Sequence, residues 1–341
     1  MSSELSKDQS KELSKEPSTK ELTIDLSWSV NGTLYQPRAD SEPKALLILV
    51  HGSGPHAREE KVGGVSVFSD LAVGLTGRIN LAVFSFDKRT FTHQSRFAAL
   101  PQDQITVFSE TIDEVLALVE HFQSRYERIA LLGHSLGGSC IPHLMAKSSA
   151  SAGIMLAASY SPLEDLIIRQ MRYLLKYAPE SGLSETIVDT TAKQVDTLKF
   201  LLATSSEETA SAAEIPAEGE ERRNGPSPNL SPNLPLGLPF EYFQSLHKLN
   251  TNALAKALDK PVMIVQGERD YQVNMDEFEA WQALLSGNPN FTFKSYEKLN
   301  HLFVEGDVGA LSVPSEYTKQ ANLPDYLLDD IANFLKQSLN L

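Results

Sequence analysis

Short apolar runs alternate with amphipathic stretches along most of the chain. Runs of six residues or fewer, bounded by polar residues, are typical of parallel strands that are buried on both faces. They comprise residues 45–50, 81–86, 129–132, 154–158 and 262–265, with a more alternating run at 291–296. Stretches with helical spacing separate them, at residues 68–75, 105–122, 137–147, 275–285 and 326–339. This order predicts an α/β fold with a mostly parallel sheet and helices on both faces.

The first ordered segment has a different pattern. From residue 22 to residue 30, apolar and polar residues alternate, Asn31-Gly32 follows, and a second run passes through Leu34 and Tyr35. Alternation on both sides of an Asn-Gly pair predicts a β-hairpin.

The alternation of strand and helix is interrupted between about residues 161 and 260. Helical spacing appears at 163–177 and 188–203, but no buried strand is evident. The interruption predicts a helical cap or lid insertion. Inside it, residues 205–238 are rich in Glu, Ala, Ser, Asn and Pro, which predicts a flexible loop.

Residues 1–20 are mostly Ser, Lys and Glu, with too few apolar side chains to offset the entropy of ordering, so we expect a disordered polar tail. Hydrophobic residues make up 41% and charged residues 22% of the chain, which is ordinary globular usage. Residues 21–341 are therefore expected to form one catalytic domain that carries the insertion.

The net charge of −14 argues against nucleic acid and anionic membranes as partners, since no basic patch opposes it. A single cysteine, Cys140, excludes an intramolecular disulfide and any metal site that needs several thiolates. We expect neither a metal nor a cofactor. The N-terminus has no apolar stretch of signal-peptide type, and no apolar run approaches the ~20 residues of a membrane helix. A cytoplasmic location is the prediction.

The segment Gly133-His134-Ser135-Leu136-Gly137 follows one predicted buried strand and opens a helical stretch. A G-x-S-x-G motif in this context predicts a nucleophile elbow, with glycines where a Cβ would clash and the serine exposed at the sheet edge. Ser135 is therefore the candidate nucleophile. The alternative is a glycine-rich turn with an incidental serine.

A serine nucleophile needs a base and an acid that orients the base, and the expected chain order is serine, acid, histidine. Asp270 follows the strand-like run that ends near Gly267, and it is the candidate acid. Glu268 and Asp276 are rivals, because a short loop can aim more than one carboxylate. His301 follows the run 291–296 and is the last histidine of the chain, which makes it the candidate base; the alternative is a surface histidine that caps the following segment.

Acyl transfer also needs donors for the oxyanion. His51-Gly-Ser-Gly-Pro55 follows the first predicted buried strand, and its glycines allow the backbone to approach a substrate. We expect the backbone N–H groups of Ser53 and Leu136 to form the oxyanion hole.

Asp87, Lys88 and Arg89 follow the run 81–86, at the same predicted edge of the sheet. Two roles compete. Asp87 and Arg89 could form a structural ion-pair network, joined by residues 58–60, or Lys88 and Arg89 could bind an anionic substrate group. Cys140 lies after the elbow, where a small core residue is favoured over a reactive thiol.

Taken together, these motifs resemble those of the α/β-hydrolase superfamily, in the esterase-like branch near dienelactone hydrolases and prolyl-oligopeptidase-type catalytic domains. The resemblance covers about residues 22–341. It implies an eight-stranded sheet, a triad of Ser135, Asp270 and His301, and a cap that bears the substrate pocket. The tail and the Pro- and Glu-rich stretch of the cap depart from the family pattern.

The triad predicts a serine hydrolase that cleaves a small carboxylic ester through an acyl-enzyme. The same groups would serve a thioesterase, a peptidase or an amidase, because they act on the acyl carbon. A non-catalytic binding protein is a third hypothesis, but its usual mark is a broken triad, and here all three residues stand in order.

Overall fold

The computed structural model describes residues 16–38, 42–212 and 234–341, and for residues 206–212 it describes the backbone alone. Most of the predicted tail and residues 213–233 of the predicted loop lie outside this part. The chain divides into two compact units. The sheet unit comprises Met1–Leu100, Val107–Ser161 and Leu249–Leu341, and the insert unit comprises Pro101–Thr106 and Pro162–Lys248.

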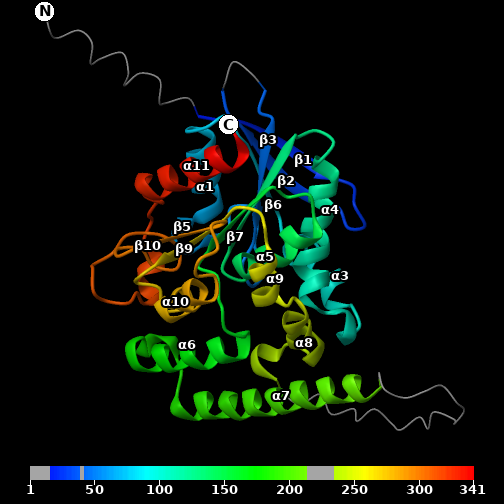
Figure 1. Ribbon diagram of the computed structural model, residues 1–341. Coiled ribbons are helices and arrows are strands. Elements are labelled where there is room, and N and C mark those ends of the chain that lie inside the picture. The colour runs from blue at the N-terminus through cyan, green and yellow to red at the C-terminus, as the bar shows by residue number, and fades with distance from the viewer. Residues whose placement is uncertain (1–15, 39–41, 213–233) are drawn as a thin grey trace, which may run out of the picture. The chain divides into compact units, whose positions relative to one another are not determined.

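An eight-stranded sheet forms the centre of the sheet unit (Figure 1). In spatial order the strands are β1 (Ser18–Ile24), β2 (Val30–Gln36), β6 (Ala82–Phe86), β3 (Ala45–Val50), β7 (Arg128–His134), β8 (Ala152–Leu156), β9 (Val262–Gly267) and β10 (Phe291–Tyr296). Strand β2 runs antiparallel to β1 and to β6, and all other pairs are parallel. The sheet is therefore mostly parallel, as predicted.

The central strands form because their side chains are buried on both faces. Every residue of β3, β6, β8 and β9 is buried, and such strands read as continuous apolar runs. In the pairing of β3 with β7, Val50 lies opposite Gly133. The carboxyl ends of these two strands, and the loops that follow them, therefore meet at one edge of the sheet.

Helices cover the sheet. α1 (Val67–Thr76) contacts α11 (Asp325–Leu339), and the two lie side by side in Figure 1. A Cβ at Gly74 would lie 2.6 Å from Leu328 Cδ1, so the glycine allows this close packing. α5 (Leu136–Lys147) packs on β7 and β8 and contacts α4 (Asp113–Phe122) and α9 (Thr251–Ala257). α10 (Met275–Leu284) packs on β9.

Short elements complete the sheet unit. They are the ribbon of β4 (Lys61–Val62) and β5 (Val65–Ser66), α2 (Arg89–Thr92), α3 (Gln94–Ala98), the π-helical turn η2 (Phe108–Ile112) and the 3₁₀ turn η5 (Pro314–Thr318). Most of them lie in loops at strand ends, where they fix the path of the chain.

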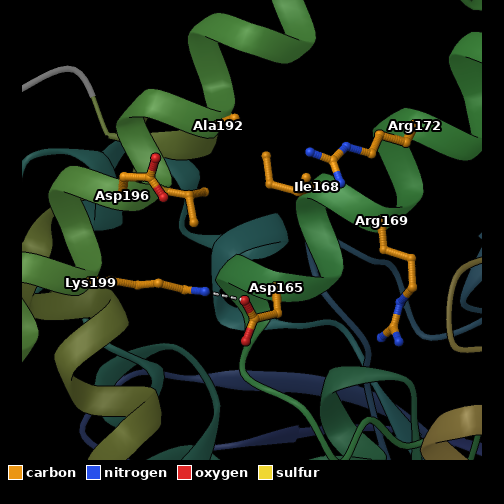
Figure 2. A pocket seen from close by; sticks show the side chains of 8 residues that line it. Asp165, Ile168, Arg169, Arg172, Ala192, Asp196 and Lys199 are labelled. Carbon is orange, nitrogen blue, oxygen red and sulfur yellow. Dashed lines mark hydrogen bonds and ion pairs between the residues drawn. The ribbon is translucent and has the colours of Figure 1, made fainter.

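The described part of the insert unit is helical, with a small core that includes Ile167, Leu198, Leu234 and Phe243. Its elements are η1 (Gln102–Gln104), α6 (Leu163–Tyr177), η3 (Pro179–Ser181), α7 (Glu185–Ala212), η4 (Pro235–Gly237) and α8 (Phe240–Lys248). A pocket of about 520 Å³ lies between α6 and α7, and Figure 2 shows the side chains that line it. Charged side chains of both signs line it, and Lys199 pairs with Asp165 across it.

Four boundaries differ from the sequence prediction. Strand β1 begins at Ser18, inside the range assigned to the tail, and the hairpin turns at residues 25–29. Gly32 lies within β2. A Cβ there would be 2.5 Å from the Phe84 ring, so close packing and not a turn requires this glycine. α7 continues to Ala212, into the predicted loop, and the helix predicted from residue 105 begins at Phe108.

Candidate active site

Ser135 lies at the turn from β7 to α5, with its backbone in an unusual conformation. Its φ is 54° and its ψ is −120°, a region that costs a non-glycine residue free energy and that clusters at functional sites. The turn is held by the Ser135 N–H, which donates to the carbonyl of Leu156 on β8 at 2.8 Å. This is the geometry of a strained elbow that exposes one side chain at the sheet edge.

The glycines on either side of Ser135 are required by close backbone contact. A Cβ at Gly133 would lie 2.2 Å from the Gly137 carbonyl oxygen, and one at Gly137 would lie 2.2 Å from the Val50 oxygen. Neither contact is possible for a real side chain. The predicted reason for both glycines is confirmed.

Asp270 and His301 are hydrogen-bonded to each other. His301 Nδ1 lies 2.7 Å from Asp270 Oδ2, and the two side chains are 5% and 0% exposed. The other carboxylate oxygen accepts the backbone N–H groups of Gln272 (2.7 Å) and Val273 (3.0 Å). Because an ionised carboxylate only accepts, Nδ1 of His301 donates to it and Nε2 is left as the acceptor that a general base needs.

The rival carboxylates point elsewhere. Glu268 accepts a hydrogen bond from the Ser295 hydroxyl at 2.8 Å, and Asp276 accepts one from the Asn274 amide at 2.8 Å. Of the three carboxylates considered, Asp270 is the one hydrogen-bonded to His301.

A buried ion pair joins the loops that carry these residues. His134, directly before Ser135, lies 2.9 Å from the backbone oxygen of His301 through Nε2 and 3.2 Å from Glu60 through Nδ1. The other oxygen of Glu60 accepts the Gly52 N–H at 2.8 Å. Both ring nitrogens of His134 thus lie near acceptors, and the contact of Nδ1 with Glu60 is an ion pair without hydrogen-bond geometry, so the arrangement favours the imidazolium form.

The pKa values of this pair agree with that assignment. Burial alone would lower the pKa of His134, but the attraction of the Glu60 carboxylate outweighs burial and raises it. Burial alone would raise the pKa of Glu60, but the positive charge of His134 lowers it. The sequence predicts a structural ion-pair network of Asp87 and Arg89 that residues 58–60 could join. Asp87 does pair with Arg58, whereas Glu60 pairs with His134. A signal for this role in the sequence is that Glu60 follows the glycine-rich segment 51–55.

The loop after β3 lies beside the elbow. A Cβ at Gly52 would be 3.3 Å from Ser135 Cβ, and Ser53, the next residue, is exposed. Leu136 is the first residue of α5, and its N–H is among those that a helix leaves without an intrahelical acceptor. The Gly52 N–H already donates to Glu60. The next N–H along the loop is that of Ser53, the oxyanion donor that the sequence predicts.

Lys88 and Arg89 are not placed to bind a substrate anion. Lys88 is 1% exposed and pairs with Glu110 at 2.6 Å. Arg89 is 6% exposed, lies 3.8 Å from Glu114 and stacks its guanidinium 5.1 Å from the ring centre of Trp28. Both charges are engaged inside the protein, so the substrate-binding prediction does not fit their placement.

Cys140 is buried, and burial raises the pKa of its thiol to about 12, so it is a core residue and not a thiolate. Among the described residues, no group of three or more His, Cys, Asp or Glu side chains is arranged to hold a metal ion. Within the same part of the chain, no helix has both the length and the apolar character needed to cross a bilayer.

Known structures share the fold. Est1E from Butyrivibrio proteoclasticus superposes with a TM-score of 0.54 at 18% identity, over 94% of this chain and 99% of that one. The Pyrococcus furiosus esterase Pf2001 gives 0.52 at 15% identity, over 94% and 91%. The Pyrococcus horikoshii acylaminoacyl peptidase gives 0.52 at 13% identity, over 94% of this chain and 42% of that one. At these identities the likeness establishes the α/β-hydrolase fold.

Sequence comparison is more specific. Esterase EstD of Thermotoga maritima is 29% identical over 318 residues, which cover 93% of this chain and 67% of that protein. The family model described as "Serine aminopeptidase, S33" matches residues 41–307, which include the elbow, Asp270 and His301. The chain is therefore a serine hydrolase of the α/β-hydrolase fold and belongs to this S33 family.

Proposed function

We propose that the protein hydrolyses carboxylic esters of small molecules, with Ser135 as nucleophile, His301 as general base and Asp270 as the group that orients the base. His301 takes the Ser135 proton, the serine oxygen attacks the ester carbonyl, and the N–H groups of Ser53 and Leu136 bind the oxyanion. The alcohol then leaves with a proton from His301, and water hydrolyses the acyl-enzyme.

The observations that carry this proposal are the buried 2.7 Å hydrogen bond between Asp270 and His301 and the positive φ of Ser135 at the elbow. His134 links the elbow to the loop of His301, because it precedes Ser135 in the chain and contacts the His301 backbone. The similarity to an esterase along 93% of the chain favours an ester as the substrate.

A peptide or amide is the second candidate, because the matching family is described as a serine aminopeptidase. The triad attacks an acyl carbon in either case, and a thioester would meet the same groups. The cytoplasmic location and the role of the insert as a substrate-binding cap stay predictions.

One series of activity assays decides among these functions. A panel of p-nitrophenyl esters, thioesters and aminoacyl p-nitroanilides is assayed with the wild type and with Ser135→Ala. We expect the highest kcat/KM for an ester, and labelling of the wild type but not the variant by a fluorophosphonate probe. Turnover by Ser135→Ala would exclude Ser135 as nucleophile, and faster cleavage of anilides than of all esters would favour the peptidase.

A further inference from the structure

Lys88 holds one particular peptide group of the loop beside Ser135. Its ammonium, buried to 1% exposure, donates to the Gly52 carbonyl oxygen at 2.8 Å and pairs with Glu110 at 2.6 Å. The Gly52 carbonyl and the Ser53 N–H belong to the same planar amide. The lysine therefore contacts the carbonyl oxygen of the amide whose N–H is proposed to bind the oxyanion.

The backbone of Lys88 holds the far end of the same loop. Its N–H donates to the His56 carbonyl at 3.0 Å, while Glu60 accepts the Gly52 N–H at 2.8 Å. Gly54, between them, has a φ of +93°, which favours glycine. The path from Gly52 to His56 is thus fixed at both ends by residues outside it.

A buried lysine is a costly way to hold a loop. Desolvating an ammonium and a carboxylate costs several kcal/mol that their attraction does not always recover, and apolar residues of similar volume are often as stable. A cation at a carbonyl oxygen does something that an apolar side chain cannot. It polarises the amide, and in a low-dielectric interior it makes the N–H of the same amide a stronger donor.

We propose that Lys88 is a positioning residue of the oxyanion hole: its ammonium orients and polarises the Gly52–Ser53 peptide, and Glu110 is its counterion. The inference rests on the proposed function, because the oxyanion exists only during acyl transfer. Lys88 acts at the site where negative charge develops, so it strengthens binding of the transition state and leaves binding of the ester in the ground state nearly unchanged.

The test uses the Lys88→Met/Glu110→Gln double variant, which removes both charges and leaves no unpaired buried ion, beside the Lys88→Met single variant. Removal of a whole oxyanion donor lowers kcat about 10²–10³-fold. Loss of polarisation alone is expected to lower kcat about tenfold, with KM within about twofold. A trifluoromethyl ketone, whose serine adduct carries an oxyanion, should lose affinity by the same factor as kcat/KM.

The matched control is Arg58→Met/Asp87→Asn. This pair also bridges the loop after β3 and the end of β6, at 2.7 Å, and the hydrogen bonds of the Arg58 side chain go to Asp87, Glu21 and Thr33. We expect the control to lower Tm and to leave kcat and the ketone affinity within about twofold of the wild type. A purely structural role for Lys88 would give the same result in both double variants.

The outcomes separate the two claims. If the wild type reacts with a fluorophosphonate at Ser135 and hydrolyses esters, but the Lys88→Met/Glu110→Gln enzyme matches the control in kcat and ketone affinity, the positioning role is wrong and the proposed function stands. If the wild type shows neither reaction, the proposed function fails and the role of Lys88 fails with it. A parallel loss of kcat and ketone affinity, absent from the control, supports the inference.

Discussion

Replacing Glu60 by Gln tests the buried pair under the elbow. Gln keeps an oxygen for the Gly52 N–H, so the perturbation removes the negative charge and little else. His134 then faces an amide and not a carboxylate, and it loses its reason to carry a second proton. Glu60 and His134 are 1% and 3% exposed, so solvent does not screen their interaction.

Glu60→Gln replaces one carboxylate oxygen by an amide nitrogen, and the expected loss of stability is large. Breaking a buried pair by removing one partner costs about 3–5 kcal/mol. The Gln amide can donate to the neutral His134 ring and recover about 1 kcal/mol. We therefore expect the free energy of unfolding to fall by about 2–4 kcal/mol at pH 6.

The loss should depend on pH in a definite direction. His134 has a raised pKa in the folded state, so its contribution is present below its unfolded value of 6.5 and is lost as pH rises through the folded value. Glu60 has a lowered pKa, so its contribution is present above 4.5 and is lost as pH falls through the folded value. The difference between wild type and variant is therefore greatest between about pH 4.5 and 6.5.

Other charges near the pair do not change this sign. His51 faces Glu60, but burial lowers its pKa to about 4, so it is neutral through most of the window. Asp270 adds to the attraction for the His134 proton.

Urea unfolding followed by tryptophan fluorescence measures the effect, because Trp28 and Trp281 both lie in the sheet unit. Glu59→Gln is the matched control, one residue away and outside the pair, and it should change stability by less than about 0.5 kcal/mol. A Glu60→Gln penalty that is equal at pH 6 and pH 10 would refute the ion pair.

Two further predictions concern the site itself. Asp270→Asn should lower kcat by about 10⁴-fold, because the amide would donate to Nδ1 of His301 and leave the base in the wrong tautomer; Glu268→Gln, assayed with the same ester, should stay within about twofold, and the reverse result would make Glu268 the acid. Gly137→Ala should lower the free energy of unfolding by about 3 kcal/mol, because its Cβ would meet the Val50 oxygen. Gly77→Ala, whose Cβ would lie 3.4 Å from the nearest atom, should be near neutral in the same urea titration, and equal penalties would contradict the clash.

The sequence predicted the parts of the fold whose burial is symmetrical. Residues 45–50 match β3 residue for residue, because a strand in a covered sheet needs apolar side chains along its length. Residues 291–296 match β10, an edge strand with one buried residue, through their alternation of apolar and polar positions. Strand β1 is different, since most of its residues are exposed and two are charged. Its pairing with β2 forms it, and that tertiary contact leaves little trace in the residues themselves.

The candidate site shows the same division. Ser135 and His301 were predictable because a local motif and a position after a strand identify each of them. The roles of Glu60 and Lys88 were not, because each acts on a peptide group outside its own local motif, eight residues away for Glu60 and 36 for Lys88. Composition alone also places Lys and Glu at the surface, whereas here both side chains are 1% exposed.

These two buried charges meet at one residue of the loop beside Ser135. Glu60 accepts the Gly52 N–H, and Lys88 donates to the Gly52 carbonyl, so the peptide groups before and after Gly52 are held by opposite charges. Both contacts are made by the backbone of Gly52, and a Cβ at this position would approach Ser135 and displace that backbone. Gly52 is therefore expected to tolerate substitution less well than Ser53, whose proposed contribution is its backbone N–H. In kinetic assays, Ser53→Ala should keep kcat within about threefold, whereas Gly52→Ala should lower it by about tenfold or more, because displacement of the peptide weakens an oxyanion donor. Equal effects of the two substitutions would show that the loop is not held at Gly52.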